Sequence, residues 1–215
     1  MEDLKEFCKT FEGTYAVEII SQVEEVYRDL ERQSEEFTTC YSIHCPPGCG
    51  TCCEKFLPDV TEAEALEAAA YLLFVKNAPE LLDKVLTHQT QEDPPCPLYM
   101  ENTPFHCQIY PARPLICRLF GACANSDKNG AAVFRKCKYN PTDSMPLSLR
   151  IDDQRPPEME DFALRIHSIS SEEHQLLPQA ISAAVEKIQM MVRQFGLFGP
   201  ENSIDPDDTP TPLAS

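Results

Sequence analysis

Residues 45–53 read Cys45-Pro46-Pro47-Gly48-Cys49-Gly50-Thr51-Cys52-Cys53, which places four thiols close together in the spacing C-x3-C-x2-C-C. Five further cysteines follow downstream, at Cys96, Cys107, Cys117, Cys123 and Cys137. Thiolates are soft ligands that select zinc, copper(I) or iron–sulfur clusters. The prolines and glycines between the first four cysteines suit a tight turn that directs several sulfurs toward one point. The stretch therefore predicts a bound metal, although it does not say what the metal is for.

The overall composition limits where such a protein works. The chain has 215 residues, 42% of them hydrophobic and 11 of them cysteine, which is enough for one domain with its own core. The N-terminal stretch 1–6 is acidic, so we expect no signal peptide, and no apolar run approaches the ~18 residues of a membrane span. We therefore expect a cytoplasmic protein, in which clustered thiols stay reduced and serve metal binding or catalysis.

The net charge of −17 argues against two classes of partner. So acidic a surface repels the phosphates of nucleic acids and of anionic membranes. Cysteine clusters of the zinc-ribbon type occur in nucleic-acid binders, but those proteins carry basic faces. We therefore expect no nucleic-acid and no membrane partner, and a protein partner stays open.

Apolar residues recur every three or four positions in several segments and predict amphipathic helices. The predicted helices cover residues 3–36, 61–76, 79–90 and 178–195. A break is expected in the first at Gly13, and Gly196 is the expected stop of the last. Thr61 followed three residues later by Glu64 has the pattern of a capping box and marks a helix start.

The rest of the chain is predicted to be irregular. Expected features are a hairpin around residues 101–103, a polar turn at 124–130, and strands at 132–134 and 147–151. The fold class is therefore mainly α, a single domain with a loop-rich, metal-stapled region and at most short strands. The expected divisions are an N-terminal helical segment 1–40, a cysteine-cluster domain 41–140, a C-terminal helical segment 141–198 that packs on it, and a disordered acidic tail 199–215.

Several residues near the cysteines are interpreted as supporting or spare groups. Cys8 lies on an apolar helix face and is interpreted as a small buried hydrophobe, and Cys40 as a spare thiol. His44 and His106 each adjoin a cysteine but are taken to be bystanders. Tyr110 and Phe120 are expected to pack around the site and exclude water.

The cysteine motifs resemble the YkgJ-like cysteine-cluster family, a zinc- or iron-chelating domain with eight cysteines. The similarity rests on the 45–53 knuckle, the Cys96-Pro97-Leu98 segment, and the stretch from Cys107-Gln108-Ile109-Tyr110 to Cys117-Arg118, and it spans roughly residues 45–140. It implies seven metal ligands, which are Cys45, Cys49, Cys52, Cys53, Cys96, Cys107 and Cys117. The eighth is Cys137 or Cys123, and Cys137 is favoured because it begins a new compact element.

Eight thiolates suit two tetrahedral four-cysteine sites, or one cluster with additional thiols. Arg113 and Arg118 flank Cys117 in an otherwise acidic chain, and we expect them to offset the thiolate charge by hydrogen bonding to sulfur. The cofactor is thus zinc or an iron–sulfur cluster, and the adjacent cysteines with their uneven spacing favour the cluster slightly.

Three other functions were weighed against chelation. A similar cluster in flagellin lysine methylases keeps open an iron–sulfur-dependent enzyme, related to protein methylation or redox chemistry. The C-x3-C-x2-C spacing is that of radical-SAM enzymes, but Thr51 replaces the usual aromatic residue and no βα barrel pattern is present. Cys49-Gly50-Thr51-Cys52 has the spacing of a thiol oxidoreductase, yet no βαβ pattern surrounds it. Catalytic residues therefore stay unassigned.

Overall fold

In a computed structural model of the chain, the described residues are 4–43, 54, 56–88, 96–101, 106–120, 123–129, 132–134, 154–170 and 174–198. Their elements, in chain order, are α1 (Lys5–Thr10), α2 (Tyr15–Cys40), β1 (Asp59–Val60), α4 (Glu62–Ala70), η2 (Tyr71–Lys76), α5 (Pro79–Leu86), η3 (Tyr110–Ala112), α6 (Leu115–Leu119), β2 (Ala124–Ser126), β3 (Ala132–Phe134), α7 (Met159–Ile169), β4 (Gln175–Leu176) and α8 (Leu177–Phe198). Helices dominate and every strand is short, so the predicted mainly α fold is confirmed.

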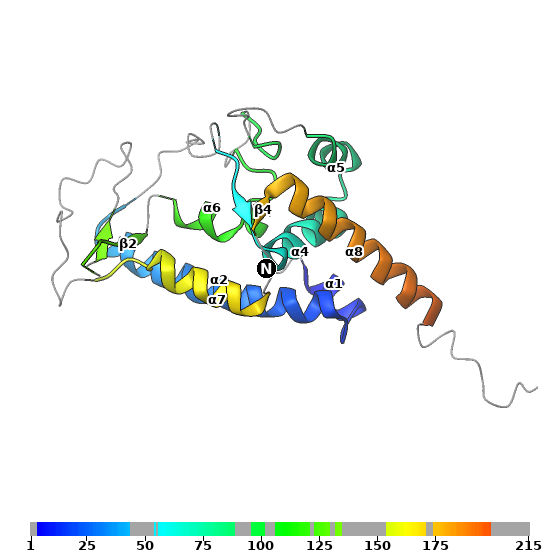
Figure 1. The fold of residues 1–215 in the computed structure, drawn as a ribbon, viewed down its shortest axis with the longest axis horizontal. Helices are drawn as coiled ribbons and strands as arrows, with labels where there is room; N and C mark the ends of the chain where they lie inside the picture. Colours follow the sequence, from blue (N-terminus) through cyan, green and yellow to red (C-terminus); the bar gives the residue numbers. More distant parts are fainter. Residues whose placement is uncertain are drawn as a thin grey trace, which may run out of the picture.

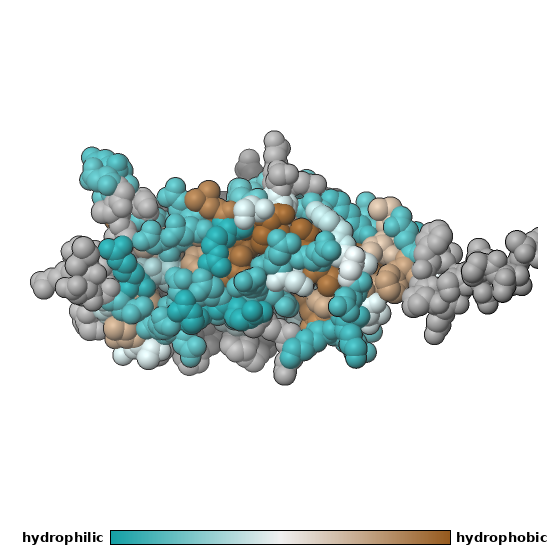
Figure 2. Space-filling view, turned by 90° about the horizontal axis from the view of Figure 1, so that it is seen from below, coloured by the Kyte–Doolittle hydropathy of each residue, from teal (hydrophilic) through white to brown (hydrophobic). Residues whose placement is uncertain are grey.

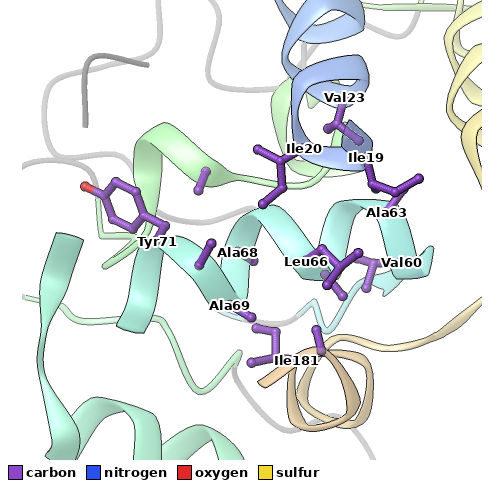
Figure 3. Packing of buried hydrophobic residues seen from close by; sticks show 14 of the residues in the cluster. Ile19, Ile20, Val23, Val60, Ala63, Leu66, Ala68, Ala69, Tyr71 and Ile181 are labelled. Carbon is purple, nitrogen blue, oxygen red and sulfur yellow. The ribbon is translucent and has the colours of Figure 1, made fainter. Parts of the chain in front are cut away.

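Helix α4 lies at the centre of the core (Figures 1 and 3). It is rich in alanine, and most of its side chains are buried. Helices α2 and α8 pack against it, and the α4–α8 contact is the most extensive between any two described elements. Ile20, Leu66 and Ile181, one from each of these helices, lie in this core with 1% exposure or less. The small alanines matter because the distance between packed helices is set by the side chains at the contact.

The first predicted helix is a broken pair, as expected. Gly13 has φ of 78°, a left-handed conformation that glycine adopts without a steric penalty, and it separates α1 from α2. Helix α2 then runs through 26 residues and ends at Cys40, beyond the predicted end at residue 36. Helix α7 packs alongside α2 (Figure 1).

The predicted helix 61–76 exists, but its second half is wound differently. The capping box at Thr61 is present, with the Glu64 backbone N–H donating to the Thr61 hydroxyl and the Glu64 carboxylate accepting from the Thr61 backbone. From Tyr71 to Lys76 the chain adopts a π-helix, and Asn77 ends it in a left-handed conformation at φ 44°. Helix α5 begins at Pro79 as predicted and ends at Leu86 rather than residue 90.

Three sequence predictions of local structure were wrong or incomplete. Residues 124–126 form strand β2, paired antiparallel with β3, where a polar turn was expected. Gly196 lies within α8 instead of ending it, because one glycine on an exposed helix face costs only about 1 kcal/mol relative to alanine. Helices α6 and α7 were not predicted. The expected strand at 147–151 and the tail at 199–215 lie outside the described residues.

One hydrophobic core joins helices from all three predicted helical or cysteine-bearing segments, 1–40, 41–140 and 141–198. The face shown in Figure 2 is mostly hydrophilic, with a hydrophobic strip along its middle. Across the described ranges, none of the helices is both long and apolar enough to cross a membrane.

Candidate metal centre

The structure describes four of the nine thiols predicted to bind metal. These are Cys96, Cys107, Cys117 and Cys123, all of intermediate exposure. The knuckle cysteines Cys45, Cys49, Cys52 and Cys53 and the favoured eighth ligand Cys137 lie outside the described residues. The geometry of the predicted centre can therefore be built only from its second half.

Cys96 and Cys107 belong to one irregular hairpin. The Met100 N–H donates to the carbonyl oxygen of His106 at 3.0 Å, and the Gln108 N–H donates to that of Leu98 at 3.0 Å. Tyr99 and Cys107 occupy opposed positions in this antiparallel bridge. The predicted hairpin around residues 101–103 is confirmed by these contacts, and it brings two thiols that are distant in sequence onto one element.

The Cys96 thiol lies near the Cys107 thiol, and its surroundings disfavour an unpaired thiolate. Burial raises the pKa of the Cys96 thiol to about 11, and the nearby Cys107 sulfur adds to the rise. The backbone of Leu98 and Tyr99 lowers the pKa of this thiol, but its effect does not outweigh burial. Two neighbouring thiolates in such a place need a cation, and a metal ion deprotonates a coordinating thiol outright.

Cys117 is carried by α6, which a buried carboxylate anchors to α4. The Leu115 N–H, at the start of α6, donates to Glu64 Oε1 at 2.8 Å. The same carboxylate accepts hydrogen bonds from the Tyr27 hydroxyl at 3.0 Å and from the Thr61 hydroxyl at 2.9 Å. A carboxylate satisfied by several donors is held in place, so the helix that bears Cys117 has a fixed position against the core.

Arg118 lies inside the protein, with only 5% of its side chain exposed. Its guanidinium donates to the carbonyl oxygens of Arg113 at 2.6 Å and Pro111 at 2.5 Å, and it pairs with Glu31. It also lies 4.0 Å from the centre of the Tyr27 ring. These contacts tie the loop before Cys117 to helix α2, whereas the predicted hydrogen bond from Arg118 to sulfur stays a prediction.

Arg113 contacts its own loop. Its Nε donates to the carbonyl oxygen of Tyr110 at 3.0 Å, and its guanidinium carbon stands 3.5 Å from the centre of the Tyr110 ring. The side chain therefore braces the turn between Cys107 and Cys117. Its predicted contact with sulfur also stays a prediction.

The structure also places the other aromatic, histidine and cysteine residues that the sequence analysis singled out. The ring of Phe120 is 38% exposed and packs edge-on against Phe56 with 5.0 Å between centroids. The His106 Nδ1 contacts the carbonyl oxygen of Met100 at 3.2 Å, and its ring stacks on Tyr99. Cys8 packs against the core as expected, and Cys40 is exposed at the end of α2.

Sequence inspection missed the buried acidic pair Glu64 and Glu67. Both project from the alanine-rich helix α4, and both are 5% exposed or less. The signal available in the sequence was two glutamates three residues apart within a run of alanines and leucine. Because the residues around them are mostly apolar, burial of these glutamates could have been expected. The sequence pattern indicated a role for Glu64 alone, as part of the capping box with Thr61.

The described thiols do not complete a metal site by themselves. Among the residues that the structure places, no group of three or more His, Cys, Asp or Glu side chains is arranged to hold a metal ion. A centre built on Cys96, Cys107 and Cys117 would therefore require ligands from elsewhere in the chain, and the sequence has further thiols at residues 45–53.

The fold and the thiols thus define a mainly helical protein with a cysteine-rich segment suited to metal chelation. Residues 44–138 match the family model CxxCxxCC, described as "Putative zinc- or iron-chelating domain". This match confirms the resemblance inferred from the motifs over that segment. No curated protein and no solved structure matches the chain.

Proposed function

We propose that the chain is a metal-binding protein in which cysteines from both halves of the 44–138 segment chelate one centre or two. The ligands are Cys45, Cys49, Cys52, Cys53, Cys96, Cys107 and Cys117, with Cys137 or Cys123 as the eighth. An iron–sulfur cluster is favoured over zinc because adjacent cysteines with uneven spacing are less typical of zinc ribbons. The metal would staple a region that has few apolar residues of its own.

The packing of Phe56 against Phe120 is the observation that carries this proposal. Phe56 follows Cys53 by three residues, and Phe120 follows Cys117 by three residues. Phe56 adjoins the knuckle in sequence and Phe120 adjoins the Cys117 helix, so their contact supports a centre that draws on both halves.

The protein's charge supports a cationic ligand. The chain carries −17 before any thiolate is counted. Further thiolates at one place would repel one another in the absence of a cation, whereas a bound metal ion compensates their charge. Arg113 and Arg118 lie in the same loop and helix as Cys117 and add positive charge next to it.

Metal and sulfide analysis of anaerobically purified protein tests the proposal. The wild type is expected to retain stoichiometric iron with acid-labile sulfide, or zinc. Replacing a hairpin ligand, Cys96→Ser, is expected to lower the bound metal by at least about half, because thiolate is the form that binds. Cys40→Ser, at an exposed thiol outside the family segment, is the matched control and should retain full metal content.

Two results would decide against parts of this proposal. Wild-type protein without stoichiometric metal, or equal metal in Cys96→Ser and the wild type, would contradict chelation by these cysteines. A colourless protein with two zinc ions and no sulfide would keep chelation and reverse the preference for an iron–sulfur cluster.

A further inference from the structure

Two histidines outside the cysteine segment face each other across a short gap. His167 lies near the end of α7 and His174 stands immediately before β4. Their Nε2 atoms are 2.8 Å apart, and their rings are 4.7 Å apart at an angle of 41°. A neutral imidazole has one N–H and one lone pair, so the two nitrogens in contact share a single proton. Both side chains are exposed and accessible to a ligand from solvent.

The histidine pair lines a pocket of about 220 Å³. Asp59 and Glu64 supply carboxylates to the same pocket, and Ile116 of the Cys117 helix forms part of another wall. The pocket therefore lies between the histidines and the helix that carries a predicted thiolate ligand. Of its acidic groups, Glu64 is already occupied by hydrogen bonds, whereas Asp59 is exposed.

The fold holds both imidazoles in place from separate elements. Strand β4 pairs antiparallel with β1, with Gln175 opposite Val60, and this fixes the backbone next to His174. Helix α7 is anchored by Phe162 and Ile166, which are 2% and 1% exposed, and this fixes the turn that bears His167. The short distance between the two nitrogens is thus a product of tertiary structure, because residues 167 and 174 lie on different elements.

We propose that His167 and His174 form a second metal site, for a divalent transition metal such as nickel or copper and separate from the cysteine centre. Two metal–nitrogen bonds of ~2.0 Å at a right angle would place the nitrogens about 2.8 Å apart. The 2.8 Å separation, which also suits the shared-proton contact, is compatible with this square geometry. Tetrahedral zinc, by comparison, needs about 3.3 Å between the two nitrogens.

The site would be open, and its metal would exchange readily. No third His, Cys, Asp or Glu completes it among the described residues, so water would fill the other coordination positions. Asp59 in the same pocket and the chain's net charge of −17 raise the local concentration of cations. Imidazole is a harder ligand than thiolate and suits copper and nickel, so this site and the cysteine centre differ in metal preference. The inference does not depend on the metal held by the cysteines.

Equilibrium dialysis of the anaerobically purified protein, with its resident metal in place and Ni²⁺ alone as the probe, tests the site. The wild type is expected to bind one additional Ni²⁺. His167→Gln and His174→Gln are each expected to weaken that binding about tenfold or more, since each removes one of two protein ligands. His88→Gln changes an imidazole that lines a different pocket, and it should bind Ni²⁺ like the wild type.

A second measurement tests whether His167 and His174 bind the metal ion directly. Substoichiometric Cu²⁺ should broaden the ring-proton NMR signals of His167 and His174 before those of His88, because a paramagnetic ion acts at short range. Unchanged Ni²⁺ affinity in both glutamine variants would overturn the site. Loss of resident metal in those variants would show that the histidines serve the cysteine centre, and it would likewise overturn a separate site.

Discussion

Glu67 projects into the core beside Arg118. Its Oε1 lies 3.7 Å from the Arg118 guanidinium, and only 4% of its side chain is exposed. Its Oε2 has no hydrogen-bond partner among the residues described. Burial raises the pKa of Glu67 to about 8, because the desolvation cost exceeds the attraction of Arg118. The carboxyl is therefore neutral in the fold over much of the neutral pH range.

Glu67 should make folding stability depend on pH. Its pKa is about 4.5 when unfolded and about 8 in the fold, so the native state binds more protons between these values. Stability then falls as pH rises through this window. Glu67→Gln removes the ionisation and should stabilise the protein at pH 8.5 by up to about 4–5 kcal/mol, with little gain at pH 4.5.

Denaturant unfolding at the two pH values checks this expectation. Glu25→Gln, at an exposed position of the neighbouring helix α2, serves as the control and should leave the pH dependence intact. The same pH slope in Glu67→Gln and the wild type would show that Glu67 is ionised in the fold, and the pKa argument would be wrong.

Features that depend on neighbours in sequence were predictable at the residue scale, whereas contacts between residues distant in sequence were not. The break at Gly13 and the cap at Thr61 depend on neighbours within a few positions, so their patterns are visible in the chain itself. Arg118 was interpreted from its neighbour Cys117, yet its carboxylate partner Glu31 is 87 positions away. No linear pattern indicates such a partner, and the same applies to the burial of Glu67.

At the scale of elements, short pieces depend on distant anchors. Helix α6 has five residues, too few to be stable alone, and Glu64 of α4 holds its first turn. Strand β2 exists because β3 pairs with it, although its own residues resemble a turn. Helix α7 carries the buried pair Phe162 and Ile166, but two apolar positions gave too weak a periodicity to predict it. The long helices α2 and α8 were predictable because their apolar residues recur over many turns and give a strong periodicity.

The cysteine hairpin and α6 should depend on metal more than the long helices do. Structural zinc sites contribute on the order of 10 kcal/mol to folding at neutral pH, whereas α2 and α8 bury apolar faces of their own. Cys117→Ser is therefore expected to increase hydrogen exchange across residues 96–120 by about tenfold or more, with protection retained in both helices.

Hydrogen exchange measured on peptides of the holoprotein tests this, with Cys40→Ser as an exposed thiol control outside the 44–138 segment. Unchanged protection across 96–120 in Cys117→Ser would mean that this cysteine is not a structural ligand. Equal loss of protection in all helices would mean that the metal holds the entire fold rather than this region.

The molecule as a whole is built around a single short helix, α4. Its faces are covered by α2, α7 and α8, which come from opposite ends of the chain. The sequence predicted most of the helices but not how they pack. An alanine-rich helix face can pack against many other helices, so its sequence does not indicate which helices will cover it. The metal-binding class was predictable, since thiol spacing is itself the signal.

Leu66 tests the central role of α4. It is 1% exposed, and Leu66→Ala should lower the free energy of unfolding by about 2–5 kcal/mol through lost burial and an unfilled cavity. Leu164→Ala on α7, at a position 64% exposed, should change it by less than about 0.5 kcal/mol. Thermal and denaturant unfolding of the two variants with metal present compare them. Similar losses of unfolding free energy in the two variants would contradict the central role of α4 in the core.

The extensive α4–α8 contact has a consequence for how the chain is made on the ribosome. Synthesis proceeds from the N-terminus, so residues 62–70 emerge long before residues 177–198. Throughout that interval the α8-facing side of α4 has no cover, and the last thiol of the 44–138 segment, Cys137, is translated before α8 begins. The nascent chain thus presents its cysteines to the cell before its core can close, and metal capture can precede completion of the fold.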